Sequence, residues 1–195
     1  MRDISEKLDK VIEIMTRMRA PLGPSAGVSE SEIEAFEERT GLSLCPELRA
    51  WYRLSNGWEE EDLMPLVRRE QTPPDLWTVE DYIVQYRDDY QGWIPIGTDG
   101  CGGQYVVFSL DGKRPVGYLD TDDQSRIEYI FASSPLCAIY ATLVQREKDN
   151  ALVASGDPYF EEEYIEDDDG AAELALDPGL AEFAGCSIPR LWETG

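Results

Sequence analysis

Four groups of acidic side chains are the residues of this sequence whose types could support chemistry. They are Glu59 to Asp62 directly after Trp58, the triplet Asp88-Asp89-Tyr90, Asp99, and the run from Glu161 to Asp169, in which seven of nine residues are acidic. Paired carboxylates can hydrolyse glycosidic bonds, but they need a fixed separation and one raised pKa. Adjacent acids in a loop provide neither condition, so the sequence does not favour this catalysis.

We interpret the same groups as a surface for a cationic partner. An acidic rim beside an aromatic side chain is typical of patches that dock Arg or Lys, although Trp58 could equally be a core residue. Acids at the end of the helix expected before Gln91 are unfavourable without a partner, because of the helix dipole. The predicted protein-binding residues are Trp58, Glu59, Glu60, Glu61, Asp62, Asp88, Asp89, Tyr90, Asp99, Glu161, Glu162, Glu163, Asp167, Asp168 and Asp169.

Two further patterns are better explained as turns. The glycine-rich segment 97–103 precedes an expected strand and lacks the helix N-terminus of a phosphate-binding loop, so we expect a hairpin turn. Asp120, Asp122 and Asp123 lack the glycine and glutamate of a calcium loop, so we expect a solvated turn. We predict no metal and no cofactor. A hydrolase that uses Asp99, Asp120 and Asp122 is the least favoured hypothesis.

The chain contains no histidine, which excludes Ser-His-Asp and Cys-His nucleophile pairs and favours a binding protein over an enzyme. Its four cysteines, Cys45, Cys101, Cys137 and Cys186, show no Cys-x-x-Cys spacing, so we expect buried free thiols rather than a zinc site. Charges interrupt the segment from Ile4 to Met18, and no run of about 18 apolar residues occurs. The expected location is the reducing cytoplasm.

The net charge is −23, and the sequence pI is near 4.1. Residues 151–195 carry 12 acidic side chains and one basic side chain, whereas residues 1–19 carry four and five. This balance repels nucleic acid phosphates and anionic membranes and favours a basic protein as partner. The alternative is that the charge only keeps the protein soluble. The sequence does not indicate the oligomeric state.

Helices are expected at the start of the chain. Apolar residues at spacings of three and four predict a helix over residues 4–19. Ser29 and Glu32 form a capping-box pattern, and Gly41 marks the end of that second helix. A third helix is expected from Pro46 to the Asn56-Gly57 pair.

The middle of the chain changes to strand-like periods. Strands are expected over 63–67, 93–96, 105–110, 115–120 and 128–131, with a helix opened by Thr78 and Asp81 before the second of them. Short turns between the later strands favour antiparallel hairpins. A last helix starts at Ser134 and is expected to end within residues 145–150. We therefore predict an α+β fold, with helices packed around a mainly antiparallel sheet of about five strands.

The stretch from Val28 to Trp58, VSESEIEAFEERTGLSLCPELRAWYRLSNGW, resembles the opening of the SUKH superfamily of Smi/Knr-type domains. The landmarks are a capped helix with Ile33, Phe36 and Glu37, then Gly41 and Leu44, Pro46, and a helix that ends in Asn56-Gly57. Cys45, before the proline, departs slightly from the expected leucine. Downstream, WIPIGTDGCGGQYVVFSL, PVGYLD and the helix from Ser134 resemble its later strands and closing helix.

The resemblance implies an α+β fold and a binding protein without shared catalytic residues. Gly41, Pro46, Asn56 and Gly57 look structural. In bacteria it implies an immunity protein that neutralises a cognate toxin, often a nuclease, by stoichiometric binding; other members regulate cell-wall assembly or serve as housekeeping interaction modules. We divide the chain into an N-terminal helix and linker (1–27), a SUKH-like domain (28–150) and an acidic C-terminal extension (151–195). Aromatic residues within the extension predict that part of it docks on the core.

Overall fold

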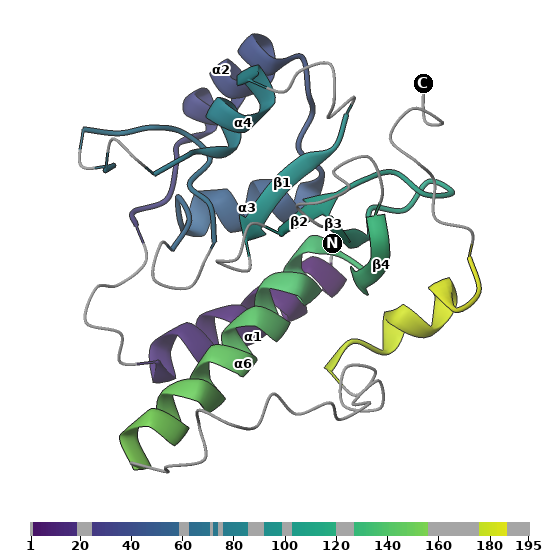
Figure 1. Ribbon diagram of the computed structural model, residues 1–195. Coiled ribbons are helices and arrows are strands. Elements are labelled where there is room, and N and C mark those ends of the chain that lie inside the picture. The colour runs from purple at the N-terminus through teal and green to yellow at the C-terminus, as the bar shows by residue number, and fades with distance from the viewer. Residues whose placement is uncertain are drawn as a thin grey trace.

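The computed structural model describes residues 2–18, 25–58, 63–70, 72–73, 76–85, 92–98, 103–119, 127–155 and 176–186. The elements within these ranges confirm an α+β fold with an antiparallel sheet (Figure 1). Their order is α1 (Arg2–Arg17), α2 (Glu30–Thr40), α3 (Pro46–Leu54), α4 (Val79–Gln85), β1 (Ile94–Thr98), β2 (Gln104–Val107), β3 (Val116–Leu119), β4 (Ile127–Ala132), α6 (Pro135–Ser155) and the 3-10 helix η3 (Pro178–Phe183).

The four strands form a meander in which each strand pairs with its sequence neighbour, in the order β1-β2-β3-β4. All three pairings are antiparallel, as short connections require. The register places Tyr105 opposite Tyr118, and Tyr118 opposite Tyr129. Side chains on one strand alternate between the two faces, so this register decides which aromatic residues share a side.

The first helices begin and end where local chemistry requires. Ser29 accepts a hydrogen bond from the backbone N–H of Glu32, and the Glu32 carboxylate accepts one from the backbone N–H of Ser29, which completes the capping box. Gly41 ends α2 in the left-handed conformation, with φ of 74°. Pro46 stands in the first turn of α3. These predicted boundaries are confirmed.

The strand expected over residues 63–67 is not formed. Leu63 makes only isolated bridges, to Trp58 and to Gly97. The segment is buried as its apolar residues suggested, but Pro65 has no N–H to give to a ladder. The backbone N–H groups of Leu66 and Val67 instead donate to the side chain of Asn56. The sheet therefore has four strands rather than about five among the described residues.

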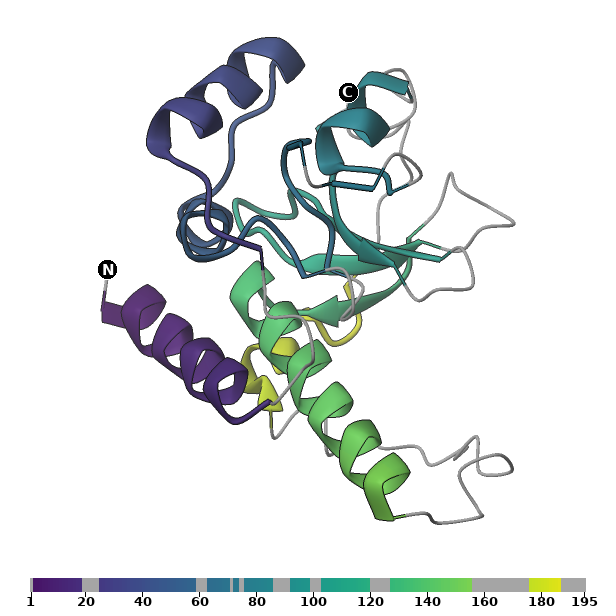
Figure 2. The same ribbon diagram turned by 90° about the vertical axis from the view of Figure 1, so that its left-hand side faces the viewer.

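Helices α1 and α6 pack side by side, outside the sheet (Figure 2). The predicted end of α6 within residues 145–150 is wrong, because the helix continues to Ser155. The polar residues there suit a solvent-facing helix: Gln145 bonds Asp149 one turn on, and Glu147 accepts two hydrogen bonds from Arg17 of α1, at 3.0 and 3.1 Å. Polarity alone does not stop a helix, since Gln145, Arg146, Glu147 and Lys148 all have high helix propensity.

A single carboxylate joins three helices near the start of α6. Glu47 of α3 accepts hydrogen bonds from the Lys7 ammonium of α1 at 2.9 Å and from the backbone N–H of Leu136 at 3.0 Å. The second contact satisfies an N–H that the first turn of α6 leaves without a partner inside the helix. Partial burial lowers the pKa of Lys7, but hydrogen bonding and attraction to Glu47 outweigh this, so the pKa lies above its ordinary value.

Apolar side chains form two clusters on opposite faces of the sheet. The larger contains residues from α1, α2, α3, α4 and α6, and it includes Phe36, Trp51 and Leu136. The smaller contains Trp93, Val106, Phe108, Leu119 and Ile127. Helices α1 and α6 lie next to each other and away from α2 and α4 (Figure 2), and residues of all four helices belong to the larger cluster. None of the helices in the described part of the chain has both the length and the apolar character needed to cross a bilayer.

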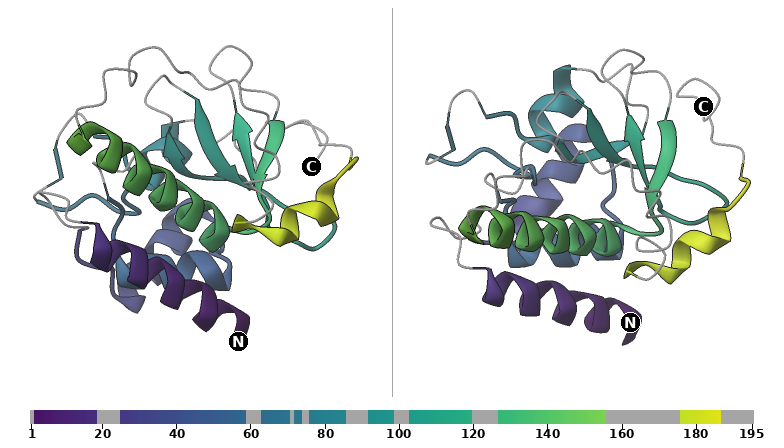
Figure 3. Two further views of the ribbon diagram at one scale, coloured as in Figure 1. Left: turned by 90° about the horizontal axis from the view of Figure 1, so that it is seen from below. Right: turned by 60° about the horizontal axis from the view of Figure 1, so that its bottom comes forward.

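Residues 176–186 pack at the turn between β4 and α6, as Figure 3 shows for the yellow segment. The Asp177 carboxylate accepts hydrogen bonds from the backbone N–H and the hydroxyl of Ser133, both at 2.6 Å. It also accepts one from the N–H of Gly179 at 3.1 Å, which caps η3. Phe183 is buried. These contacts agree with the expectation that part of the C-terminal region docks; the division of the chain into domains stays a prediction.

The free cysteines are less buried than expected. Cys45 and Cys137 are half-buried, and Cys186 is exposed. Burial is the main cause that raises the pKa of the Cys45 and Cys137 thiols, which makes them poor nucleophiles near neutral pH. Cys101 lies outside the described residues.

Candidate protein-binding surface

Of the predicted binding residues, only Trp58 lies within the described ranges. Its side chain is 2% exposed and belongs to the main core, so it is the core residue of the two alternatives rather than an exposed anchor. The remaining predictions fall outside the described residues: Glu59, Glu60, Glu61, Asp62, Asp88, Asp89, Tyr90, Asp99, Glu161, Glu162, Glu163, Asp167, Asp168 and Asp169.

A row of three tyrosines crosses the sheet on one face. Tyr105, Tyr118 and Tyr129 stand opposite one another on β2, β3 and β4, and we call them the tyrosine row. Their neighbouring ring centroids are 5.7 and 5.1 Å apart, and the Tyr118 and Tyr129 rings are nearly parallel, with 17° between their planes. Tyr105 also contacts Phe131 at 4.6 Å. The row is thus one continuous aromatic surface.

The tyrosine row runs from the core to solvent. Tyr105 packs against the main core cluster and is half-buried, as is Tyr118. Tyr129, on the last strand of the sheet, is 46% exposed. Cross-strand aromatic pairs stabilise a sheet, but an exposed aromatic ring at the end of such a row is also typical of protein interfaces, which are enriched in Tyr, Trp and Arg.

A second exposed apolar feature lies on α4. Trp77 is 39% exposed and Val84 is 57% exposed. They line a depression of about 540 Å³, together with Arg68, Thr78, Glu80, Asp81 and Gln85. The two acids here form ion pairs: Glu80 with Arg39 at 2.5 Å, and Asp81 with Arg68 at 2.8 Å. The depression is therefore close to neutral.

Asp81 in this depression is held in its charged form. Partial burial raises the pKa of Asp81, but hydrogen bonds from the N–H and hydroxyl of Thr78, and then from Arg68, outweigh burial. The pKa of Asp81 consequently lies below its ordinary value. Its main role is to cap α4, since Thr78 and Asp81 bond each other reciprocally, as predicted from the sequence.

A cleft of about 520 Å³ separates η3 from the first turns of α1 and α6. Three lysines line it (Lys7, Lys10 and Lys113), as do four acids (Asp3, Glu6, Asp177 and Glu182). Most of these charges pair within the protein, including Lys7 with Asp3 and Lys113 with Glu182. Across the described ranges, no group of three or more His, Cys, Asp or Glu side chains is arranged to hold a metal ion. The cleft is a docking seam for η3 rather than a charged binding site.

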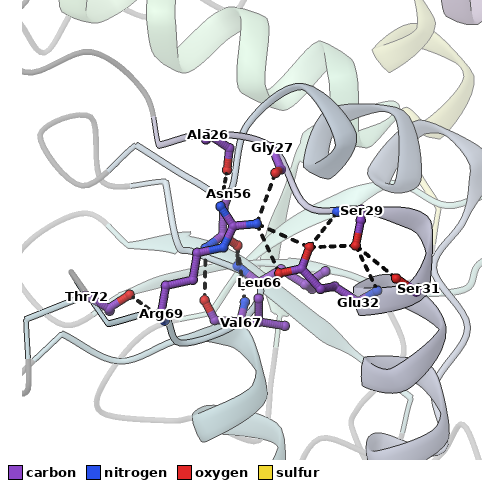
Figure 4. A network of polar contacts seen from close by, with 10 residues as sticks. All are labelled: Ala26, Gly27, Ser29, Ser31, Glu32, Asn56, Leu66, Val67, Arg69 and Thr72. Carbon is purple, nitrogen blue, oxygen red and sulfur yellow. Dashed lines mark hydrogen bonds and ion pairs between the residues drawn. The ribbon is translucent and has the colours of Figure 1, made fainter.

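Buried Asn56 is the centre of a polar network that shapes the segment after α3 (Figure 4). Its side-chain oxygen accepts hydrogen bonds from the N–H groups of Leu66 at 2.9 Å and Val67 at 3.2 Å, and its amide nitrogen donates to the Val67 carbonyl at 2.9 Å. Asn56 is 2% exposed. One amide therefore satisfies three backbone groups that would otherwise be buried without partners.

The same network extends to the start of α2 through Arg69. Its guanidinium donates to the carbonyls of Ala26 and Gly27 and forms an ion pair with Glu32 at 3.1 Å (Figure 4). Hydrogen bonds from Ser29, mainly from its backbone N–H, lower the pKa of Glu32, and Arg69 lowers it further. Arg69 therefore links the capping box of α2 to the segment that follows residue 63.

Gly57 is needed beside this network for two reasons. Its φ is 84°, which L residues with a side chain rarely adopt. A Cβ atom there would also lie 2.5 Å from the Pro65 nitrogen and 2.6 Å from the Leu63 carbonyl oxygen. Gly41 has a similar φ, but its surroundings are open. The roles of Asn56 and Gly57 are structural.

The model of the SMI1 / KNR4 family (SUKH-1) matches residues 27–134, which is more than half of the chain. The chain belongs to the SMI1 / KNR4 family (SUKH-1). The matched range begins before the capping box of α2 and ends at the turn into α6. Comparison with curated proteins and with solved structures found no significant match.

The landmarks from Val28 to Trp58 that the sequence shares with the superfamily lie inside the matched range. The superfamily generally comprises non-enzymatic binding proteins, and membership fits an immunity protein or a cell-wall-related interaction module. Helices α1 and α6 both lie outside the matched range. The tyrosine row, the α4 depression and the Asn56 network all lie within it.

The tyrosine row is the feature that sequence reasoning missed. All three tyrosines stood on expected strands, which was the available signal. Their alignment depends on the register of two strand pairs, and a shift of one residue would move a side chain to the other face. The acidic runs were predicted as the binding surface instead, because a run of like charges can be recognised in a sequence without knowing the strand register.

Proposed function

We propose that this protein is a cytoplasmic immunity protein that neutralises a cognate bacterial toxin by stoichiometric binding. The observation that carries the proposal is membership in SUKH-1, over residues 27–134. The proposed partner is a basic protein, such as a nuclease domain. The protein needs no cofactor, no metal and no turnover for this function.

The net charge of −23 supports a basic partner. A nuclease must hold phosphates at a cationic site, and an acidic protein can cover such a site by complementary contact. Long-range attraction between opposite charges raises association rates by roughly 10- to 1000-fold and weakens with salt. Rapid capture suits a protein that must act before a toxin does damage.

The acidic groups identified in the sequence remain our proposed contact residues. They are Glu59 to Asp62, Asp88 to Tyr90, Asp99 and the acidic positions within 161–169. Trp58 is not among the proposed contacts, because its side chain is in the core. Negative charge is concentrated in the region 161–169. The first helix, in contrast, carries equal numbers of acidic and basic side chains.

Co-expression tests this function directly. The protein is expressed in bacteria together with the product of each neighbouring gene that encodes a toxic protein, and growth is measured. We expect growth to be restored by this protein and a 1:1 complex to be isolated with an inactivated toxin variant. A toxic neighbouring product whose toxicity this protein does not relieve, together with no complex, would contradict immunity.

The same family membership favours a cell-wall-related interaction module as a second candidate. Deletion of the gene in a strain that lacks the neighbouring toxin separates the two. An immunity protein is then dispensable, whereas loss of a cell-wall module changes sensitivity to cell-wall antibiotics without any toxin.

A further inference from the structure

We propose that the tyrosine row, Tyr105, Tyr118 and Tyr129, is a docking surface for an arginine-bearing segment of the partner protein. This inference rests on one part of the proposed function, the binding of a basic protein partner, and it names the chemistry that the surface selects. It does not depend on whether the partner is a toxin or a cell-wall protein.

The first step is the geometry of the rings. The three side chains lie in register on adjacent strands, with centroids 5.7 and 5.1 Å apart. The strands are buried and paired on both sides of Tyr118, so the sheet fixes where the rings stand. A surface that is ordered before binding loses little side-chain entropy on contact.

The second step is the change in exposure along the row. Tyr105 is anchored in the core through Phe131, at 4.6 Å, whereas Tyr129 is 46% exposed on the last strand of the sheet. The near-parallel contact between Tyr118 and Tyr129 holds the exposed ring in place. A rigid aromatic ring at the surface, supported from behind, has the properties of an interface hot spot.

The third step is the chemistry that such a surface prefers. The face of a tyrosine ring attracts cations. A guanidinium group is planar and weakly hydrated, so it stacks on aromatic rings, whereas an ammonium group is a compact and strongly hydrated charge. A row of aromatic rings therefore binds arginine in preference to lysine by stacking. A patch of carboxylates also separates the two residues, but mainly through hydrogen-bond geometry.

The fourth step is charge. The whole chain carries a net charge of −23. Glu128, next to Tyr129 on β4, is exposed. The surface therefore attracts a cationic segment and repels an anionic one.

The α4 depression does not carry the same inference. Its apolar side chains, Trp77 and Val84, are exposed, but Glu80 and Asp81 are neutralised by Arg39 and Arg68. It serves instead as the matched control, because Trp77 is an exposed aromatic side chain on a different element.

The experiment uses two probes of equal charge, capped nona-arginine and capped nona-lysine peptides, titrated into the full chain by calorimetry at fixed ionic strength. We expect nona-arginine to bind about three- to fivefold tighter than nona-lysine. In the double variant Tyr118→Leu/Tyr129→Leu, the ratio should fall by at least half, with the affinity for nona-lysine unchanged. Tyr118→Phe/Tyr129→Phe keeps the rings and should keep the ratio, as should Trp77→Leu.

Circular dichroism and thermal unfolding verify that each variant is folded; if the leucine double variant is not, the single variant Tyr129→Leu, at the more exposed site, decides. An unchanged arginine preference in the leucine variant would place the preference on carboxylates and overturn the inference. Loss of the preference in Trp77→Leu would do the same. Failure of the co-expression test rejects immunity without affecting this result, since the peptides contain no toxin.

Discussion

Asn56 shows how one buried side chain decides the path of a segment. Its amide satisfies two N–H groups and one carbonyl in residues 66–67, where the sequence suggested a strand. We predict that Asn56→Ala lowers the free energy of unfolding by about 3 kcal/mol, because buried polar groups lose their partners. Urea unfolding measures this. Gln145→Ala, which removes an exposed side-chain hydrogen bond on α6, is the control and should cost under about 1 kcal/mol.

Tyr52 gives a prediction of the opposite sign. It is fully buried in α3, and its hydroxyl is the buried side-chain polar atom that lacks a hydrogen-bond partner within the described ranges. Burial raises the pKa of Tyr52, so the hydroxyl stays neutral. Tyr52→Phe should raise the free energy of unfolding by about 1 kcal/mol, since an orphan hydroxyl is removed without loss of the ring. A clear loss of stability by thermal unfolding would show that the hydroxyl has a partner.

The contribution of Glu32, at the start of α2, to the free energy of unfolding depends on pH. Its pKa is lowered in the folded state, mainly by the hydrogen bond from the Ser29 backbone and further by Arg69. Its stabilisation is therefore complete above the unfolded pKa near 4.3 and is lost as pH falls through the lower folded pKa. Glu32→Gln, which can still form a capping box, should cost about 0.5 kcal/mol at pH 7.

The difference in unfolding free energy between Glu32→Gln and the native chain should shrink as pH falls from about 5 to 3. Denaturant unfolding at several pH values measures it. Asp9→Asn on α1 is the control, because the exposed Asp9 lies in no salt bridge of the described residues. A difference for Glu32→Gln that stays constant with pH would argue that the amide and the carboxylate are equivalent there.

At the scale of elements, the docking of η3 depends on one carboxylate. Asp177 is 4% exposed and bonds Ser133 through two atoms, whereas the Lys113–Glu182 pair is exposed. We predict that Asp177→Ala increases hydrogen exchange of residues 178–186 by tenfold or more, because several bonds to a charged group are lost together. Glu182→Gln should change it less than threefold.

Mass spectrometry of the exchanged peptides provides this measurement. Exchange over β2 and β3 should stay the same in both variants, because η3 packs mainly against β4. Equal exchange in Asp177→Ala and the native chain would mean that Phe183 alone holds the segment.

At the scale of the whole molecule, charge controls how fast a partner is met. We predict that the association rate with a basic partner falls at least tenfold between low and physiological salt. Reversal of Glu59, Glu60 and Glu61 to lysine should slow association further. Stopped-flow fluorescence with the cognate partner measures both effects.

A matched triple variant tests whether position or net charge matters. Glu6, Asp9 and Glu13 are exposed on α1, and their reversal to lysine changes the net charge by the same amount. We expect a smaller effect on association from this helix. Equal slowing by both triple variants would remove Glu59 to Glu61 from the proposed contact surface.

The sequence by itself determined the features that depend on near neighbours or on composition. Ser29, Gly41 and Pro46 set helix ends because capping bonds and backbone angles involve residues a few positions apart. The four strands of the antiparallel meander followed from their alternation and short turns. The acidic charge and the resemblance to SUKH were also readable in the chain.

Only the tertiary structure decided the features that depend on distant partners. Residues 63–67 bond the Asn56 side chain rather than a strand, and α6 extends to Ser155 along α1 through Arg17 and Glu147. Trp58 lies in the main core, and three tyrosines share a face because two registers align them. Each of these outcomes is set by groups far apart in sequence, whose meeting no local pattern encodes.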